Sequence, residues 1–239
     1  MSKLIAVTSG KGGVGKSTVS AGIARTLAAE GETVLLVDGD AGFRCLDLML
    51  GVSEQTVFDW ADVVSGRCTL GEAAVKSPLG PSVLAAPFAP SFGDEEAFGR
   101  LIGEAAADFD TVLVDFPAGL REAACRALPA DTLFLTVATP DPLCVRDAAA
   151  ICRALMPFAA HRRLIVNRFD KKRVKSGELC GIDDMIDRSA TRLLGVVPED
   201  AAAAGKLGAG LPLRRGPAVR AFARIADRLS GRDVPLVLK

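Results

Sequence analysis

Short apolar runs rich in β-branched residues alternate along the chain with longer stretches of helical periodicity. The runs, each expected to form a strand, cover residues 4–8, 33–37, 83–86, 111–115, 132–138, 164–167 and 193–197. The helical stretches cover residues 16–30, 95–107, 142–156, 183–192 and 217–229. This alternation predicts an α/β fold with a mostly parallel sheet. Because several runs lack polar alternation, we expect strands buried on both faces, in a doubly wound sheet with helices on both sides.

The length of the chain limits the number of domains. With 239 residues and 49% hydrophobic side chains, it has enough apolar material for one sizeable core. We therefore predict a single domain over residues 1–239. Ligands of open α/β sheets bind at the carboxyl ends of the strands. The irregular stretches 39–51 and 80–93 lie next to predicted strand ends, and functional residues are expected in such loops.

Charge and cysteine content exclude some classes of function. The 29 basic side chains equal the 29 acidic ones, so the overall charge argues neither for a general nucleic-acid coat nor for an acidic tail. The six cysteines form no Cys-x-x-Cys pair and there is one histidine, His161, so a zinc site is not indicated. The N-terminus enters a strand-like run without a signal segment, and no run approaches the roughly 18 apolar residues of a spanning helix. These features favour a cytoplasmic protein with reduced thiols.

Residues 10–17 satisfy the phosphate-loop pattern G-x-x-x-x-G-K-[ST], between a predicted strand and a predicted helix. Its glycines let the backbone fold tightly, so that consecutive N–H groups and the helix N-terminus face phosphate oxygens. Lys16 should reach the β- and γ-phosphates, Ser17 should bind Mg²⁺, and Thr18 should bond a phosphate. The backbone expected around the phosphates comprises Gly10, Lys11, Gly12, Gly13, Val14 and Gly15.

A second lysine, Lys11, stands near the γ-phosphate end of this loop, where an ammonium can act on a neighbour's nucleotide as an arginine finger does. Residues 11–18 resemble the deviant phosphate loop of the MinD/ParA family of ATPases, and most closely that of its MinD members. In that family the first lysine crosses the interface of an ATP-bound sandwich dimer. The resemblance extends from residue 3 to about residue 229. It implies ATP and Mg²⁺ as ligands, hydrolysis of ATP to ADP and phosphate, and a homodimer when ATP is bound.

Two carboxylates, Asp38 and Asp40, follow the apolar run 33–37, at the loop edge where magnesium and the attacking water should lie. Residues 42–48 resemble the family's first switch, with Cys45 where Asn is usual. The resemblance implies that Asp40 orients the water and that Asp38 shapes the loop. Asp40 therefore joins Lys11 and Lys16 as an expected catalytic residue. Capping of the next element is the alternative role for both carboxylates.

Asp115 ends another hydrophobic run, as required of a Walker B carboxylate that holds Mg²⁺ directly or through water. Residues 115–119 also resemble the family's second switch. Gly119 would let this loop approach the γ-phosphate, so loss of that phosphate would release the loop. The predicted metal ligands are Ser17, Asp40 and Asp115, and a turn-forming aspartate is the alternative for the last of them.

Asn167 ends a predicted strand and is well placed to hydrogen-bond a purine edge, with Arg168 beside it. The run Asn-Arg-x-Asp also approximates the guanine-reading Asn-Lys-x-Asp of P-loop GTPases, so the residues alone leave the base open. The family resemblance favours ATP. Pro198 and Asp200 lie in a Pro-Glu-Asp run like that of the family, and either border the adenine pocket or cap a helix.

Seven basic residues lie between Arg162 and Lys175, against one acid, Asp170. This basic loop is either a solvated surface or a patch that meets DNA or acidic lipid. The last predicted helix, 217–229, has one apolar side and an arginine stripe, and we expect it to dock on the core rather than to lie on a membrane. Many MinD proteins end in a short amphipathic helix that enters the membrane. Residues 231–239, with Pro235, form no such helix, so recruitment by this route is not expected.

The leading hypothesis is a MinD-like ATPase whose dimerisation and slow hydrolysis act as a switch that positions a cellular structure, foremost the division septum. The resemblance implies regulators of the MinC/MinE type, which meet the helix that contains residues 145–147. The expected location is the cytoplasm, with peripheral association at the inner face of the cell membrane as an alternative. A ParA-like partition ATPase that binds DNA, a flagellar-placement ATPase of the same superfamily and, last, a GTPase are the alternative functions.

Overall fold

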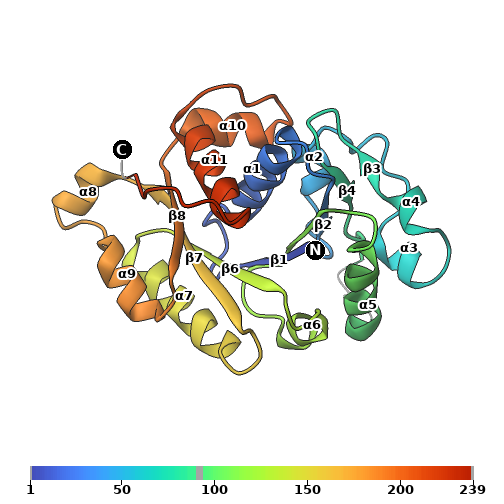
Figure 1. The fold of residues 1–239 in the computed structure, drawn as a ribbon, viewed down its shortest axis with the longest axis horizontal. Helices are drawn as coiled ribbons and strands as arrows, with labels where there is room; N and C mark the ends of the chain where they lie inside the picture. The colour runs from blue at the N-terminus through green and yellow to red at the C-terminus, as the bar shows by residue number, and fades with distance from the viewer. Residues whose placement is uncertain (1, 90–93, 238–239) are drawn as a thin grey trace.

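The computed structural model describes residues 2–89 and 94–237, and its strands form one eight-stranded sheet (Figure 1). The sheet order is β3-β4-β2-β5-β1-β6-β7-β8, and all neighbours are parallel except β3 and β4. The strands are β1 (Lys3–Thr8), β2 (Val34–Asp38), β3 (Val75–Lys76), β4 (Ser82–Leu84), β5 (Thr111–Asp115), β6 (Leu133–Ala138), β7 (His161–Phe169) and β8 (Leu193–Pro198). The predicted fold class, a doubly wound and mostly parallel sheet, is confirmed.

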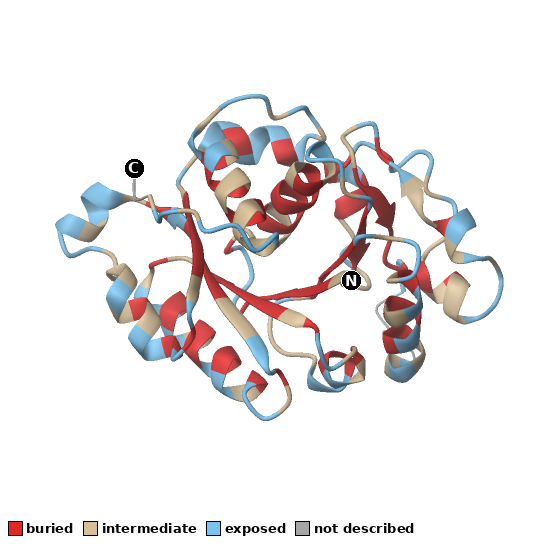
Figure 2. Cartoon of the chain, viewed as in Figure 1, coloured by how far each residue is buried: buried red, intermediate tan, exposed pale blue. Residues whose placement is uncertain are grey.

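The sheet is buried on both faces because successive side chains of each strand enter different cores. In β1, Ile5 and Val7 belong to the core under α1 and α11, whereas Leu4 and Ala6 belong to the core on the opposite face. Figure 2 shows the strands as an almost continuous buried layer with helices on either side. This double burial explains why these strands read as unbroken apolar runs in the sequence.

The helices divide between the two faces of the sheet. Five of them correspond to the predicted helices: α1 (Lys16–Ala29), α5 (Glu95–Ala105), α7 (Pro142–Leu155), α9 (Ile182–Ser189) and α11 (Pro217–Leu229). The other helices of the described residues are α2 (Leu46–Met49), α3 (Trp60–Val64), α4 (Leu70–Ala73), α6 (Glu122–Ala127), α8 (Lys171–Lys175) and α10 (Ala201–Gly208). Helices α1, α10 and α11 lie together on one face, and α5, α6 and α7 lie on the other (Figure 1).

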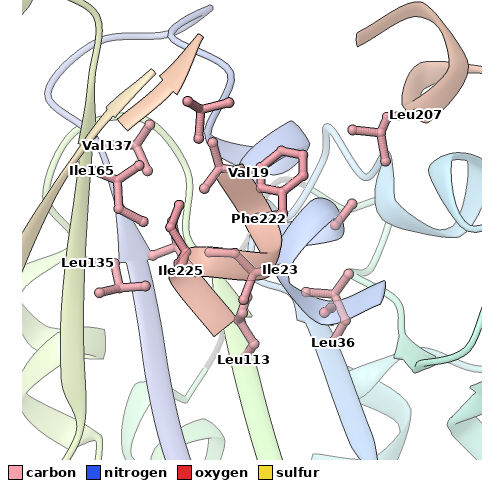
Figure 3. Packing of buried hydrophobic residues seen from close by; sticks show 14 of the residues in the cluster. Val19, Ile23, Leu36, Leu113, Leu135, Val137, Ile165, Leu207, Phe222 and Ile225 are labelled. Atoms are coloured by element: carbon pink, nitrogen blue, oxygen red, sulfur yellow. The ribbon is translucent and has the colours of Figure 1, made fainter. Parts of the chain in front are cut away.

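Helix α11 docks on the core, as expected from its apolar side. Phe222 and Ile225 are buried and pack beside Val19 and Ile23 of α1 (Figure 3). The approach of the two helices depends on Gly22, because a Cβ there would lie 2.5 Å from the Phe222 ring. Arg228 of the arginine stripe donates to the Leu194 carbonyl at 2.8 Å rather than facing outward alone.

The structure differs from the sequence prediction at several short elements. Strand β3, the antiparallel edge strand, and the six short helices were not predicted. Strand β7 begins three residues earlier and ends two later than the predicted run 164–167. Residues 90–93 of the predicted irregular stretch 80–93 lie outside the described residues. Within the described part of the chain, no helix has the length and apolar character needed to cross a bilayer.

Candidate functional site: a phosphate-loop cleft

The phosphate loop connects β1 to α1 at the carboxyl edge of the sheet, where the sequence predicts it. Gly13 and Gly15 have φ values of 79° and 86°, a left-handed conformation that glycine adopts without steric cost. The loop borders a cleft of about 300 Å³. Its lining unites most of the predicted phosphate site: Ser9, Lys11, Gly12, Gly13, Val14, Gly15, Lys16, Ser17, Thr18, Asp40, Ala118 and Arg168.

Two glycines of the loop allow close contacts with neighbouring elements. A Cβ at Gly10 would lie 2.4 Å from the backbone carbonyl carbon of Asp147, so the loop begins directly against α7. A Cβ at Gly15 would lie 2.4 Å from Nδ2 of Asn167. These contacts fix the loop between α7 and the end of β7, which preorganises its N–H groups for an anion.

Lys16 and Asp115 form a buried ion pair at the base of the cleft. Lys16 Nζ lies 3.0 Å from Asp115 Oδ1, and their side chains are 8% and 1% exposed. The Ser20 hydroxyl, one turn along α1, donates to the same Oδ1 at 2.9 Å. Asp115 therefore holds the lysine that is predicted to bind phosphates. Sequence reasoning missed Ser20, although its position four residues after Lys16 puts it on the same helical face.

Asp38 shapes the first switch through both carboxylate oxygens. Oδ1 accepts from the Asp40 N–H at 3.0 Å, and Oδ2 accepts from the N–H groups of Cys45 and Leu46 at 2.8 and 3.0 Å. Burial raises the pKa of Asp38 to about 6, against the opposing effect of these three hydrogen bonds. The loop-shaping role and the capping role of Asp38 are thus one and the same. Cys45 takes part through its backbone N–H, which any residue type except proline supplies.

Asp40 contributes its side chain to the cleft, whereas the carboxylate of Asp38 is bound within the loop. It lines the cleft with Lys11 and Lys16 and is half-buried. Desolvation raises the pKa of its carboxyl, and the positive charge of Lys16 acts in the opposite direction. Lys11 is exposed and forms no ion pair with any described residue, so its ammonium is available to a ligand or to another chain.

The residues at the base of the cleft fit a magnesium ion. Asp115 Oδ2 is buried and has no hydrogen-bond partner among the described residues. The described residues contain no cluster of three or more His, Cys, Asp or Glu side chains arranged to hold a metal. Mg²⁺ needs no such cluster at a nucleotide site, because one or two protein ligands join phosphate oxygens and waters. Asp115 and the Ser17 hydroxyl are the groups that would hold it, with Asp40 nearby.

The second switch is tied to the phosphate loop through Gly119. Its N–H donates to the Ser9 carbonyl at 2.9 Å, and the two residues form an isolated antiparallel bridge. Gly119 has a φ of 89°, and its neighbour Ala118 lines the cleft. The second switch therefore runs from Asp115 at the end of β5 to a contact with the phosphate loop at Gly119, four residues later.

A second hollow next to Gly15 and Thr18 contains the residues predicted to read the base. It is lined by Asn167, Arg168, Pro198 and Asp200, with Phe222 at its inner wall. Asn167 is buried and donates to the Val14 carbonyl at 2.8 Å, which joins β7 to the phosphate loop. Arg168 has a φ of 53°, rare for a residue with a side chain.

Asp200 caps a helix, which is one of the two roles that the sequence left open, and its place at an adenine pocket stays a prediction. It caps α10 by accepting from the Ala203 N–H at 3.0 Å, and it accepts from the Ala218 N–H at 3.3 Å. It also lines the hollow beside Pro198.

The predicted basic loop between Arg162 and Lys175 is not one surface. Arg162 and Arg163 lie at the start of β7, whereas Arg168 lies at its end beside the cleft. At about 3.3 Å per residue, the two groups are about 16 Å apart along the strand. The remaining basic residues are on α8. The strand continues through the basic residues because it pairs with β6 from His161 onward, which the sequence pattern did not reveal.

The comparisons with known proteins agree with this geometry. One protein family matches residues 5–213 of the chain, and its description is "CobQ/CobB/MinD/ParA nucleotide binding domain". The septum site-determining protein MinD of Bacillus subtilis is 35% identical over 246 residues, which cover 99% of this chain and 92% of the relative. MinD of Helicobacter pylori is 34% identical over 251 residues, which cover 99% of this chain and 94% of the relative.

Solved structures of MinD proteins have the same fold. The MinC:MinD cell division protein complex of Aquifex aeolicus matches with a TM-score of 0.89 and 32% identity, and the match covers 99% of each chain. MinD of Pyrococcus horikoshii complexed with Mg-ADP matches with a TM-score of 0.83 and 27% identity, over 96% of each chain.

Proposed function

The chain belongs to the CobQ/CobB/MinD/ParA nucleotide-binding family and is an ATPase that uses Mg²⁺, and from this premise we propose that it is a MinD-like dimerisation switch. In this proposal, two chains face each other across bound ATP, and slow hydrolysis releases them. The switch serves spatial positioning, foremost of the division septum, as the names of its relatives suggest.

The observation that carries the proposal is the exposed Lys11 at the rim of the cleft. Lys16 is already paired with Asp115, whereas Lys11 has no acidic partner among the described residues. A free ammonium beside a phosphate site, on the surface, is suited to contact the nucleotide of a second chain. The proposal therefore gives the two lysines of one loop different tasks.

Four residues at or beside the cleft have defined parts in the proposed reaction. Bound Mg²⁺ would neutralise phosphate charge and polarise the phosphoanhydride bond. Lys16 would exchange Asp115 for phosphate oxygens, and Asp40 would orient the water for attack. Gly119 would carry the second switch, so that loss of the terminal phosphate loosens the surface at which the chains meet.

The dimerisation step is tested with Lys11→Ala and a non-hydrolysable ATP analogue. We expect the variant to bind the analogue but to remain a monomer by multi-angle light scattering, whereas the unchanged protein doubles its mass. Lys171→Ala, which removes another exposed lysine on α8, is the control and should dimerise normally. A full dimer of Lys11→Ala would refute the proposed role.

We also propose that α7 is where regulators of the MinC/MinE type act. Val145 is buried, so Arg146 is the exposed member of the predicted contact residues 145–147. Asp147 touches Gly10 through its backbone, which links this surface to the phosphate loop. Arg146→Glu should weaken stimulation of ATP hydrolysis by the regulator without changing the basal rate.

DNA binding by a ParA-like protein is the second candidate. A hollow of about 350 Å³ at the start of β7 is lined by His161, Arg162, Arg163 and Arg192, and no acidic residue lines it. Glutamate substitutions at Arg163 and Arg192 should abolish a mobility shift of DNA with the ATP analogue, if this function applies. No shift by the unchanged protein would exclude it, and would leave the MinD-like and flagellar-placement roles to be separated by their partners.

A further inference from the structure

A large cavity lies along the C-terminal half of α1 and shares no lining residue with the phosphate cleft. It has a volume of about 510 Å³ and lies between α1, the turn that joins β3 to β4, and the segment that leads into α11. We call it the α1–α11 cavity. Ligand sites of proteins typically have volumes of about 300–1,000 Å³. The cavity shares Phe222 with the base hollow and no residue with the phosphate cleft.

The walls of this cavity are mostly apolar, and Arg25 and Thr26 are their polar side chains. Leu79, Leu213, Val219 and Phe222 contribute the larger apolar side chains. The hydroxyl of Thr26, another lining residue, is used within the helix, where it donates to the Gly22 carbonyl at 2.8 Å. Arg25 is the one charged residue of the lining.

Arg25 is a buried cation without an acidic partner. It is 9% exposed, and no ion pair joins it to any carboxylate in the described parts of the chain. Nη2 donates to the Leu211 carbonyl at 3.0 Å, but Nη1 is buried with no hydrogen-bond partner among the described residues. Desolvation lowers the pKa of this guanidinium, which reflects the cost of burying its charge. Buried charges are normally paired, so the structure leaves beside the cavity a cation without a carboxylate partner.

We propose that the α1–α11 cavity binds a small apolar carboxylate, whose carboxylate pairs with Arg25 and whose hydrocarbon part fills the apolar space. A carboxylate suits the site better than a phosphate, because it carries a single negative charge and Arg25 is the one cation of the lining. A phosphate would bring additional charged oxygens to walls that offer no further free donor. The charge and the shape of the cavity thus select an amphipathic monoanion.

Octanoate is a suitable probe, with octanol and acetate as matched compounds that lack the charge or the chain. By titration calorimetry on the whole protein, we expect octanoate to bind with one site per chain. Octanol should bind at least about tenfold more weakly, since it cannot form the charge-assisted pair. Acetate should show no binding at the same concentrations.

Two variants test the cavity by different means. Arg25→Gln removes the charge and should weaken octanoate by at least about tenfold while leaving octanol unchanged. Ala223→Trp fills the cavity from α11 and should remove the binding of both compounds. Arg220→Gln, at an exposed arginine of the same helix, is the control. The thermal unfolding of each variant shows whether it is folded.

Several results would overturn the proposal. Equal binding of octanoate and octanol would mean that Arg25 does not select an anion. Unchanged octanoate affinity in folded Ala223→Trp would locate the ligand elsewhere, and a lack of octanoate binding by the unchanged protein would reject the site. These results are independent of ATP, so they do not bear on the dimerisation switch.

Discussion

The ion pair between Lys16 and Asp115 makes a quantitative prediction about stability without nucleotide. Lys16→Met leaves Asp115 charged and 1% exposed, with the Ser20 hydroxyl as its one remaining side-chain donor in the described structure. Removing one partner of a buried ion pair costs about 3–5 kcal/mol, because the other charge stays buried. We expect Lys16→Met to lose that much free energy of unfolding.

The reverse substitution should cost less. In Asp115→Asn the ammonium of Lys16 is left without its partner, but Lys16 also lines the open cleft. Its flexible stem lets the charge move toward water, so we expect a loss of about 1–2 kcal/mol. Independent effects would add to about 4–7 kcal/mol in the double variant. Because the double variant contains neither charge, we expect it to lose only about 1–3 kcal/mol.

The assay is urea unfolding of all four proteins at pH 7, without nucleotide or magnesium. A double variant at least as stable as Lys16→Met would support a strongly coupled buried pair. Strict additivity of the two single changes would refute the reasoning, and so would a Lys16→Met protein as stable as the unchanged one. Ser20→Ala is a useful reference, since it removes a neutral donor to the same oxygen and should cost about 1 kcal/mol.

Three further predictions concern packing and thiol chemistry. Gly10→Ala should lower stability by about 1–3 kcal/mol, since its Cβ would lie 2.4 Å from the backbone of α7, whereas Gly12→Ala, with 3.9 Å of space, should not; urea unfolding compares the two. Gly22→Ala gains about 1 kcal/mol of helix propensity but overpacks Phe222 at 2.5 Å, so a net loss of about 1–2 kcal/mol is expected, and a more stable variant would contradict the packing argument. Burial, followed by nearby glutamates, raises the pKa of Cys125 to about 12, so its alkylation by iodoacetamide should keep rising with pH above 9, as mass spectrometry of the modified peptides can follow.

The long elements of this fold could be predicted because their burial leaves a direct trace in the sequence. A strand buried on both faces reads as a run such as residues 111–115, and β5 has those bounds. The five predicted helices were likewise visible from their period, and Pro142 and Pro217 stand at the first turns of two of them. The place of the site at the carboxyl edge of the sheet could also be predicted. The parallel strands β1, β2 and β5 end at the same edge, which brings the phosphate loop, Asp38 and Asp115 together.

Most of the unpredicted helices have only four to six residues, which is too few for a periodic pattern, and α10 has eight. Two of them nevertheless had a local signature. Asp59 and Asp62 form a capping box at α3, and Thr69 and Glu72 form another at α4. The spacing of a capping residue and an acid three positions later was present in the sequence. Strand β7 was underestimated for another reason, since its first residues are basic and owe their conformation to pairing with β6.

The pairing of the two buried cations of α1 could not be predicted from any pattern in the sequence. Lys16 and Arg25 are both cations of one helix, nine residues apart, and both are almost fully buried. Asp115, from the end of a distant strand, neutralises Lys16, whereas no carboxylate of the described chain reaches Arg25. The phosphate-loop motif identifies Lys16 from the sequence alone. That Arg25 lacks an acidic partner can be seen only in the folded structure. A buried charge without a partner costs free energy, and a ligand that supplies the partner recovers part of it. Octanoate should therefore raise the unfolding temperature of the unchanged protein, and should raise that of Arg25→Gln much less.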